Sequence, residues 1–519
     1  MREQDYQKQL YILLIISFIT RAFLAAWHEL GNDEVYYYTY ALYPDWSHFD
    51  HPPMIGWVIQ FFSLNLTFDH EFFLRLPAVV FVTINTWLIY QSGCLIGRMR
   101  AGWYAALLYT ASVYAFVITG FMILPDAPQN FFWTLSLWLM LKTVHPATTN
   151  NQRQWLWALL GMTIGLGMIS KYTAVFLWFG YAVFVILYHS RWLRQPMLWI
   201  AVLISAAFLI PVVWWNFSND FVSFSFQGER VNIFNGTIRP DLFFTELGGQ
   251  MIYNNPVVFV IAWISVFALW TQKSSRPTPY HRLLLWLSLP LILLFLFFSL
   301  FRSTLPHWTG PAYTSLILLS ADFLEKRSRR LFPFVTQIAL AILMVFILIG
   351  SLQIKTGFIP MKKETEYHRL GKNDVTLDMF GWRSLKPAFE SVRNRLVSSG
   401  EMDADDAIIG ENWFPLANLD YYVARPLGMK VFGLGEPQRL HKYMWINNIR
   451  GGMKVGDDFW YITSSRDYKH PDEVYTDWFD QIIPADTLQI KRSGQVAKRY
   501  FIFLLKDLKS SPPDYLLAK

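Results

Sequence analysis

The chain has 519 residues, of which 53% are hydrophobic and 18% aromatic, while only 16% are charged. Ordinary soluble domains carry about 25% charged residues, so this composition argues against a simple soluble protein. The formal net charge of +7 is explained better by membrane topology than by nucleic-acid binding, as described below. The single cysteine, Cys94, excludes a disulfide framework within one chain.

Apolar segments that approach the ~20 residues needed to cross a bilayer recur along the first 351 residues. No small-residue cleavage site follows the first of them, residues 10–27, so we expect a retained anchor and not a signal peptide. The sequence predicts a mainly helical, polytopic membrane protein with about eleven transmembrane helices. These lie at 10–27, 77–97, 101–122, 127–144, 155–170, 172–189, 196–216, 252–271, 283–301, 308–324 and 331–351.

Basic residues set the orientation of such a chain. With a cytoplasmic N-terminus, fifteen Lys and Arg fall in cytoplasmic segments, and only Arg75, Lys171, Arg230, Arg239 and Arg302 fall in the opposite short segments. Twelve of the sixteen Asp and Glu before Lys355 lie on that opposite, outer side. Acidic residues contribute little to orientation, so their bias indicates a site on the outer face.

After residue 355 the composition becomes that of a soluble domain. Short β-like runs appear in DAIIGENW, DDFWYIT and YFIFLLK, and PLANLDYYVA is typical of a helix. We therefore expect a transmembrane unit at 1–355, with outer loops at 28–76 and 217–251. A soluble α/β domain at 356–519 is expected outside the cytoplasm.

The first outer loop is acidic and aromatic. It includes GNDEVYYYTYALYPDWSHFDHPPM, residues 31–54, which contains Asp33, Glu34, Asp50 and His51. The following stretch, MIGWVIQFFSLNL, is amphipathic, as is typical of a helix in the membrane interface. Asp33 and Glu34 are also explained as caps of a helix beginning near Val35, since Asp is a favourable N-cap residue.

Three further outer corners carry ionisable residues. Asp126 lies in FMILPDAPQNFFW, Lys171 in GLGMISKYTAVF, and Arg302 and His307 in LFRSTLPHWTGPAY. A helix cap would explain Asp126, and a snorkelling side chain would explain Lys171. Binding of a lipid phosphate is the alternative for a lysine on the side where basic residues are rare.

The order of NDEVYYY, FDHPPM, LPDAP, SKYTA and LPHWTGPAY resembles the membrane glycosyltransferases of the GT-C fold. The resemblance is closest to the branch with the lipid A aminoarabinose transferase and the bacterial relatives of protein O-mannosyltransferases (families 83 and 39). It runs from the first span to about Tyr313, and a soluble outer tail also fits. It implies a sugar donor carried on polyprenyl phosphate and transfer outside the cytoplasm.

The resemblance also implies roles for individual residues. Asp33 matches the catalytic acid of the first outer loop and is expected to be the general base, with Glu34 as the catalytic neighbour that orients it. Asp126 matches the acid of the second loop and is the alternative base.

The remaining candidates concern the donor. Lys171 matches a lysine near the donor phosphate, and Arg302 and His307 are expected on the same phosphate, although His307 lies where the branch varies. Asp50 and His51 stand where the aminoarabinose enzyme has a Glu and binds a metal, so a divalent metal ion is the one cofactor implied.

The sequence therefore predicts an inverting glycosyltransferase in the bacterial inner membrane. It would move a sugar from an undecaprenyl-phosphate-like donor to a hydroxyl or phosphate of an envelope lipid, glycan or protein, without nucleic-acid partners. A transporter or flippase of lipid-linked sugars is an alternative, as is a non-catalytic glycan-binding scaffold. Transporters place ionisable residues near mid-membrane, whereas these cluster at one face. The cytoplasmic side has no Gly-rich phosphate loop, which argues against an ATP-driven pump.

Overall fold

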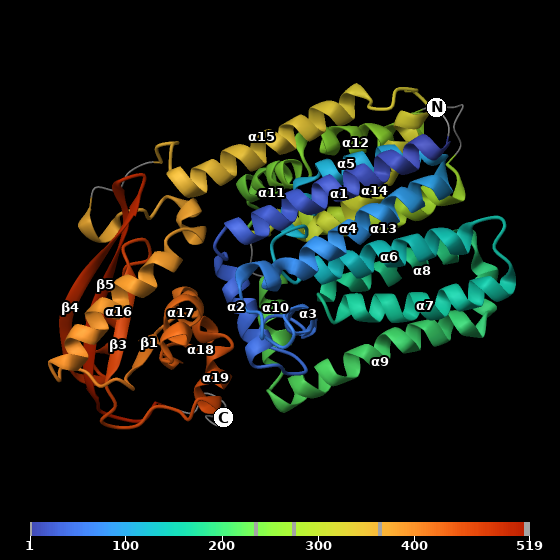
Figure 1. The fold of residues 1–519 in the computed structure, drawn as a ribbon. Coiled ribbons are helices and arrows are strands. Elements are labelled where there is room, and N and C mark those ends of the chain that lie inside the picture. Colours follow the sequence, from blue (N-terminus) through green and yellow to red (C-terminus); the bar gives the residue numbers. More distant parts are fainter. Residues whose placement is uncertain (1–2, 233–236, 272–276, 362–365, 513–519) are drawn as a thin grey trace. The chain divides into compact units, whose positions relative to one another are not determined.

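The computed structural model describes residues 3–232, 237–271, 277–361 and 366–512 (Figure 1). The chain forms two compact units. One contains Met1–Ala26 and Pro44–Phe346, and the other contains Trp27–Tyr43 and Ile347–Lys519. Part of the first outer loop thus belongs to the unit that holds the C-terminal domain.

The first unit is helical, and each of the eleven apolar segments consists mainly of helix, although 101–122 is interrupted at Ser112 and 252–271 falls on two helices. The helices α1, α4, α9, α13 and α15 are long and apolar enough to cross a membrane, and the pair α11 and α12, bent by 104°, is a sixth candidate. The chain is therefore a multi-pass membrane protein, while the number eleven stays a prediction. The bounds are α1 Glu3–Trp27, α3 Met54–Phe62, α4 Glu71–Ile96, α5 Met99–Ala111, α6 Asp126–Val144, α7 Asn150–Met168, α8 Phe176–Tyr188, α9 Pro196–Ser218, α10 Val222–Val231, α11 Pro240–Tyr253, α12 Pro256–Thr271, α13 Pro279–Phe298, α14 Gly310–Glu325 and α15 Phe334–Thr356.

Small residues let these helices pack closely. A Cβ atom on Gly93 of α4 would lie 2.7 Å from the Cα of Gly102 in α5, and one on Gly161 of α7 would overlap the backbone of Ala201 in α9. Helix pairs in membranes use such positions because lipid offers no hydrophobic drive for association. The opposite faces stay apolar and exposed, for example Leu203 on α9 at 67% and Met344 on α15 at 58%, as lipid contact requires.

The second unit contains a five-stranded sheet in the order β2-β1-β3-β5-β4. The strand β1 pairs in parallel with β2 and β3, while β5 is antiparallel to β3 and β4. The three predicted β-like runs fall on β1, β3 and β5, and the predicted helix falls on α17, so the α/β fold of this region is confirmed. The bounds are β1 Ala407–Gly410, β2 Val431–Gly433, β3 Phe459–Ser464, β4 Phe479–Arg492, β5 Gln495–Leu508, α2 Asn32–Leu42, α16 Trp382–Ser398, α17 Trp413–Leu419, α18 Pro437–Leu440, α19 Tyr443–Ile449 and α20 Asp472–Tyr475.

The segment 27–43 joins the second unit through specific polar bonds. The Tyr422 hydroxyl accepts a 2.6 Å hydrogen bond from the amide of Leu30, and the Glu29 carboxylate accepts one of 2.7 Å from the amide of Trp382. On α2, the ring of Tyr36 packs on Trp413 with their centroids 5.0 Å apart. These contacts hold α2 in the second unit, so the environment of Asp33 is set there.

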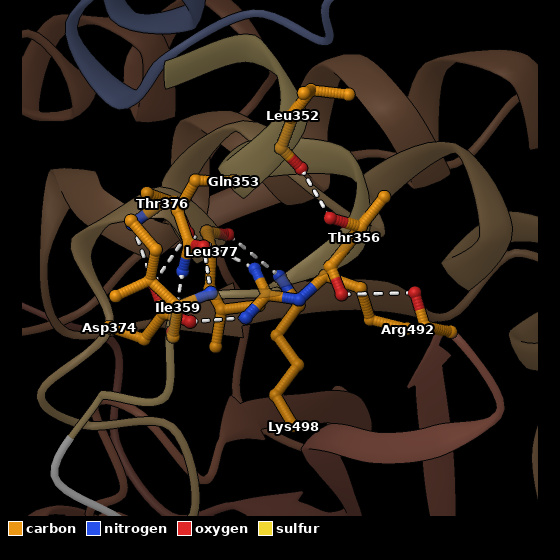
Figure 2. A network of polar contacts seen from close by, with 10 residues as sticks. Leu352, Gln353, Thr356, Ile359, Asp374, Thr376, Leu377, Arg492 and Lys498 are labelled. Carbon is orange, nitrogen blue, oxygen red and sulfur yellow. Dashed lines mark hydrogen bonds and ion pairs between the residues drawn. The ribbon is translucent and has the colours of Figure 1, made fainter. Parts of the chain in front are cut away.

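The end of α15 is fixed to the turn between β4 and β5 (Figure 2). The Gln353 side chain bonds both the amide and the carbonyl of Ile359, at 2.8 and 3.1 Å, which closes the turn after the helix. Beside it, the Arg492 guanidinium pairs with the buried Asp374 carboxylate and donates to the Thr376 hydroxyl at 3.0 Å. The end of α15, from Ile347 onward, therefore belongs to the second unit.

Candidate functional site

The loop that follows Tyr43 packs on α9 and α10 within the first unit. The indole of Trp215 donates a 2.7 Å hydrogen bond to Asp45, and the side chain of Gln227 donates to the backbone carbonyl of Asp50. The rings of Phe49 and Phe226 lie 4.8 Å apart. These contacts fix the FDHPP segment, so Asp50 and His51 have defined positions.

A buried ion pair joins two of the other corners. Asp126 is the first residue of α6, where Pro125 holds the N-cap position, and Lys171 lies in the extended break between α7 and the short turn that precedes α8. The Lys171 ammonium contacts both Asp126 carboxylate oxygens, at 2.9 and 2.8 Å. Only 8% and 4% of the two side chains are exposed. In this structure Asp126 does not cap its helix, and Lys171 does not extend to solvent.

The imidazole rings of His51 and His307 lie near this ion pair. Burial lowers the pKa of His51 to about 4, although the Asp50 carboxylate raises it. Burial likewise lowers the pKa of His307 to about 4, against the opposing effect of Asp126. Both rings are therefore neutral at pH 7 and supply hydrogen-bonding groups, not positive charge.

Arg230 is the site residue that the sequence motifs missed. It lies in the last turn of α10, with its guanidinium 5.3 Å from the ring centre of Phe226 and 5.0 Å from that of Trp308. Its charge acts on both His51 and His307, which places it at the same cluster. In the sequence, Arg230 was marked only by its place on the predicted outer side, where basic residues are rare.

Arg302 makes a different set of contacts. Its guanidinium donates to the backbone carbonyls of Glu229 and Asn232, the latter at 2.9 Å. These carbonyls end α10, where a cation satisfies the unpaired acceptors of the helix terminus. Arg302 thus holds the helix that carries Arg230.

Asp33 and Glu34 lie in the second unit, in the first turn of α2. The helix begins at Asn32, three residues earlier than the cap interpretation required. The buried Glu34 carboxylate accepts a 2.8 Å hydrogen bond from the amide of Gly31 and so closes the helix start. Asp33 is exposed on this turn.

A metal ion finds few ligands among these residues. The Nε2 of His51 lies 4.0 Å from an Asp50 carboxylate oxygen. Within the part of the chain that the structure describes, no three His, Cys, Asp or Glu side chains come together as a metal site. Zinc sites use three or more such ligands, whereas Mg²⁺ is often held by only one or two carboxylates together with the phosphates of a substrate. Metal binding at Asp50 and His51 therefore stays a prediction, and we derive no step through a metal.

The arrangement in the first unit brings together Asp50, His51, Asp126, Lys171 and His307, with Arg230. It combines two cations with two carboxylates and two neutral imidazoles in a largely buried setting. Such a site is suited to holding an anion that enters from the bilayer, because the cations and ring N–H groups replace its water.

Part of the first unit matches a known protein family. Residues 50–215 match the family described as dolichyl-phosphate-mannose-protein mannosyltransferase, a range that includes Asp50, His51, Asp126 and Lys171. Together with the structural match below, this confirms the predicted resemblance to membrane glycosyltransferases of the GT-C fold.

Solved structures of another protein, ArnT, are similar to almost the whole of this chain. The structure of ArnT from Cupriavidus metallidurans in the apo state matches 96% of this chain and 98% of its own, with a TM-score of 0.60 and 14% identity. ArnT bound to undecaprenyl phosphate matches with a TM-score of 0.58, over 95% of this chain and 97% of its own, at 12% identity. At these identities the likeness establishes a shared fold.

Two curated relatives match in sequence. Lipid A galacturonosyltransferase RgtD of Rhizobium johnstonii is 21% identical over 56% of this chain and 59% of its own length. An undecaprenyl phosphate-alpha-4-amino-4-deoxy-L-arabinose arabinosyl transferase of Proteus mirabilis is 25% identical over 52% of this chain and 49% of its own. The chain thus spans about half the length of the curated relatives it matches.

Proposed function

We propose that this protein is an inverting glycosyltransferase. It moves a sugar from a polyprenyl-phosphate donor to a hydroxyl or phosphate of an envelope lipid or glycan, at the outer face of a bacterial inner membrane. The observation that carries the proposal is the buried ion pair of Lys171 and Asp126, with the half-buried Arg230 and two neutral imidazoles near it. The names of the relatives support it, since they transfer sugars to lipid A or from undecaprenyl phosphate.

The reaction assigns a task to each kind of group. An acceptor oxygen attacks the anomeric carbon, the bond from that carbon to the phosphate oxygen breaks, and the phosphate leaves with the electron pair. Cations stabilise the charge that develops on the phosphate, which is the task of Lys171 and Arg230. His51 and His307 donate hydrogen bonds there, and Asp33, by its match to the family position, takes the acceptor proton.

The function is tested by mass spectrometry of envelope lipids and glycans from cells with and without the gene. We expect one sugar modification to disappear without the protein and to return with the wild-type chain. Loss of a flippase would instead leave the unmodified lipid-linked sugar on the cytoplasmic leaflet. An envelope unchanged in every sugar-bearing component would contradict the proposal.

We propose that the C-terminal domain lies outside the cytoplasm. The support is the asymmetry of fifteen basic residues against five, together with the predicted odd number of spans. A protease added to intact spheroplasts should cleave within residues 366–512. Protection of this region, with cleavage only after the membrane is permeabilised, would mean that the number of spans is even.

Arg230 and Arg302 provide a matched pair of arginines in one unit. Arg230→Gln should raise the KM for the polyprenyl-phosphate donor by about tenfold, because hydrogen bonds to charged groups contribute ~1.5–3 kcal/mol. Arg302→Gln should mainly lower the melting temperature, since this arginine ends α10, with a smaller effect on donor KM. A donor KM unchanged in Arg230→Gln, measured by radiolabelled transfer in detergent, would remove Arg230 from the phosphate.

A further inference from the structure

The parallel part of the sheet in the second unit has a topological switch point. Strand β1 lies between β2 and β3 and is parallel to both. The chain passes from β1 to β2 on one side and then returns across β1 to β3 on the other. In open parallel sheets, connections that leave in opposite directions open a crevice at the carboxyl ends of the two strands, and ligands bind there.

A cavity of about 240 Å³ lies at this position. Its floor is formed by the carboxyl ends of β1 and β3, through Gly410, Glu411 and Thr463. Its wall is formed by the start of α17, including Phe414 and Leu416. Pockets for drug-sized ligands are ~300–1,000 Å³, so this one suits a ligand of about one sugar ring. Topology and cavity, which are independent observations, therefore indicate the same place.

The polar groups in the cavity are mostly acceptors. The Glu411 side chain, in a residue only 8% exposed, accepts a 3.2 Å hydrogen bond from Asn412. Asp467 lines the opposite side, where it contacts the hydroxyl of Ser464 at 3.5 Å. Burial raises the pKa of both carboxyl groups, because the cavity gives their charge little solvation. Glu411 also has a side-chain hydrogen bond with Tyr461, and a ligand with hydroxyl or ammonium donors would add to these bonds at the remaining lone pairs of the two carboxyl groups.

The lining also excludes other ligands. No Lys or Arg is among the described residues that line the cavity, although Lys469 and Arg466 act on the two carboxyl groups from outside the lining. The carboxyl groups themselves face the cavity and would repel an anion. Phosphates, nucleotides and uronic acids are thus disfavoured. The aromatic rings of Phe414 and Tyr461 offer apolar surface, which the C–H faces of a sugar ring can cover.

We propose that this cavity in the soluble domain is a second sugar-binding site. It takes a single ring that carries hydroxyl or ammonium donors and no anionic group. Such a site would give the soluble domain a role in recognising a glycan, which goes beyond the proposed transferase function.

Saturation-transfer NMR and calorimetry on the full-length protein in detergent test this with three matched sugars. Glucosamine should bind at millimolar concentration, glucose more weakly, and glucuronate least. Glu411→Gln keeps the shape of the side chain and should weaken glucosamine binding by about tenfold, because a charge-assisted hydrogen bond becomes neutral. Asp477→Asn, an exposed acid of the same domain outside the cavity, is the control and should bind as wild type does.

Thr463→Val keeps the volume of the side chain and loses its hydroxyl, so it gives a second test if Glu411→Gln lowers the yield of folded protein. It should weaken both glucose and glucosamine binding, with the melting temperature retained. Glucuronate bound as tightly as glucosamine would overturn the proposal. So would glucosamine affinity unchanged in both variants, or no saturable binding of any of the three sugars. Because binding is read without transfer, failure here leaves the proposed transferase function untouched.

Discussion

Replacement of Asp33 by asparagine is expected to reduce sugar transfer by about 10²–10⁴-fold, the usual contribution of a general base. Asparagine keeps the shape of the side chain but cannot accept the acceptor's proton at neutral pH. The change should leave the fold intact, because the bond that closes the start of α2 comes from Glu34 to Gly31. Charge near a helix N-terminus contributes only ~0.3–1 kcal/mol, so stability should fall little.

Glu34→Gln is the matched control in the next position. Its amide oxygen still accepts the hydrogen bond from Gly31, so helix α2 should begin at the same residue. Transfer should then fall far less than in Asp33→Asn. Single-turnover assays and thermal unfolding of the two purified variants make the comparison. If folded Asp33→Asn transfers sugar at a near-normal rate, Asp33 is not the base and Asp126 takes its place as the candidate.

The sequence predicted the kinds of element well, because hydrophobic patterning is local. The apolar run 196–216 forms most of α9, and the short continuous apolar run YFIFLLK forms part of β5. Which compact unit a segment joins depends on contacts between residues that are far apart in the sequence. The bond from Leu30 to Tyr422 joins residues 392 positions apart, and nothing in the composition of the loop reveals it. The boundary at 355 therefore left out the segment 27–43.

The sequence also predicted residues of the candidate site without showing how they pack together. Motifs marked Asp126 and Lys171, and the fold brings them into one pair. They could not show which of two outer arginines faces the cluster, because that depends on how α10 packs. Arg302, in a motif, bonds to the helix end, while Arg230, outside any motif, lies beside the imidazoles. Charge counts predict that both arginines lie on the same side of the membrane, and only packing separates the two residues.

Lys171→Met is expected to destabilise the protein by about 3–5 kcal/mol, since it leaves the Asp126 carboxylate buried without its cation. Asp126→Asn should destabilise for the converse reason. The double variant Lys171→Met with Asp126→Asn removes both charges, and neutral replacements of a buried pair are often close to neutral in stability. Thermal unfolding in detergent should therefore show the double variant more stable than either single variant.

Sugar transfer should not follow the same pattern. If Lys171 stabilises the leaving phosphate, the double variant regains stability while its transfer rate stays about 10²-fold or more below wild type, as for loss of a preorganised donor. A structural pair would instead give recovery of both quantities together. The two readouts on one set of four proteins thus separate a role in chemistry from a role in folding. Near-normal transfer by the stable double variant would assign the pair to structure alone and leave Arg230 as the cation for the donor phosphate.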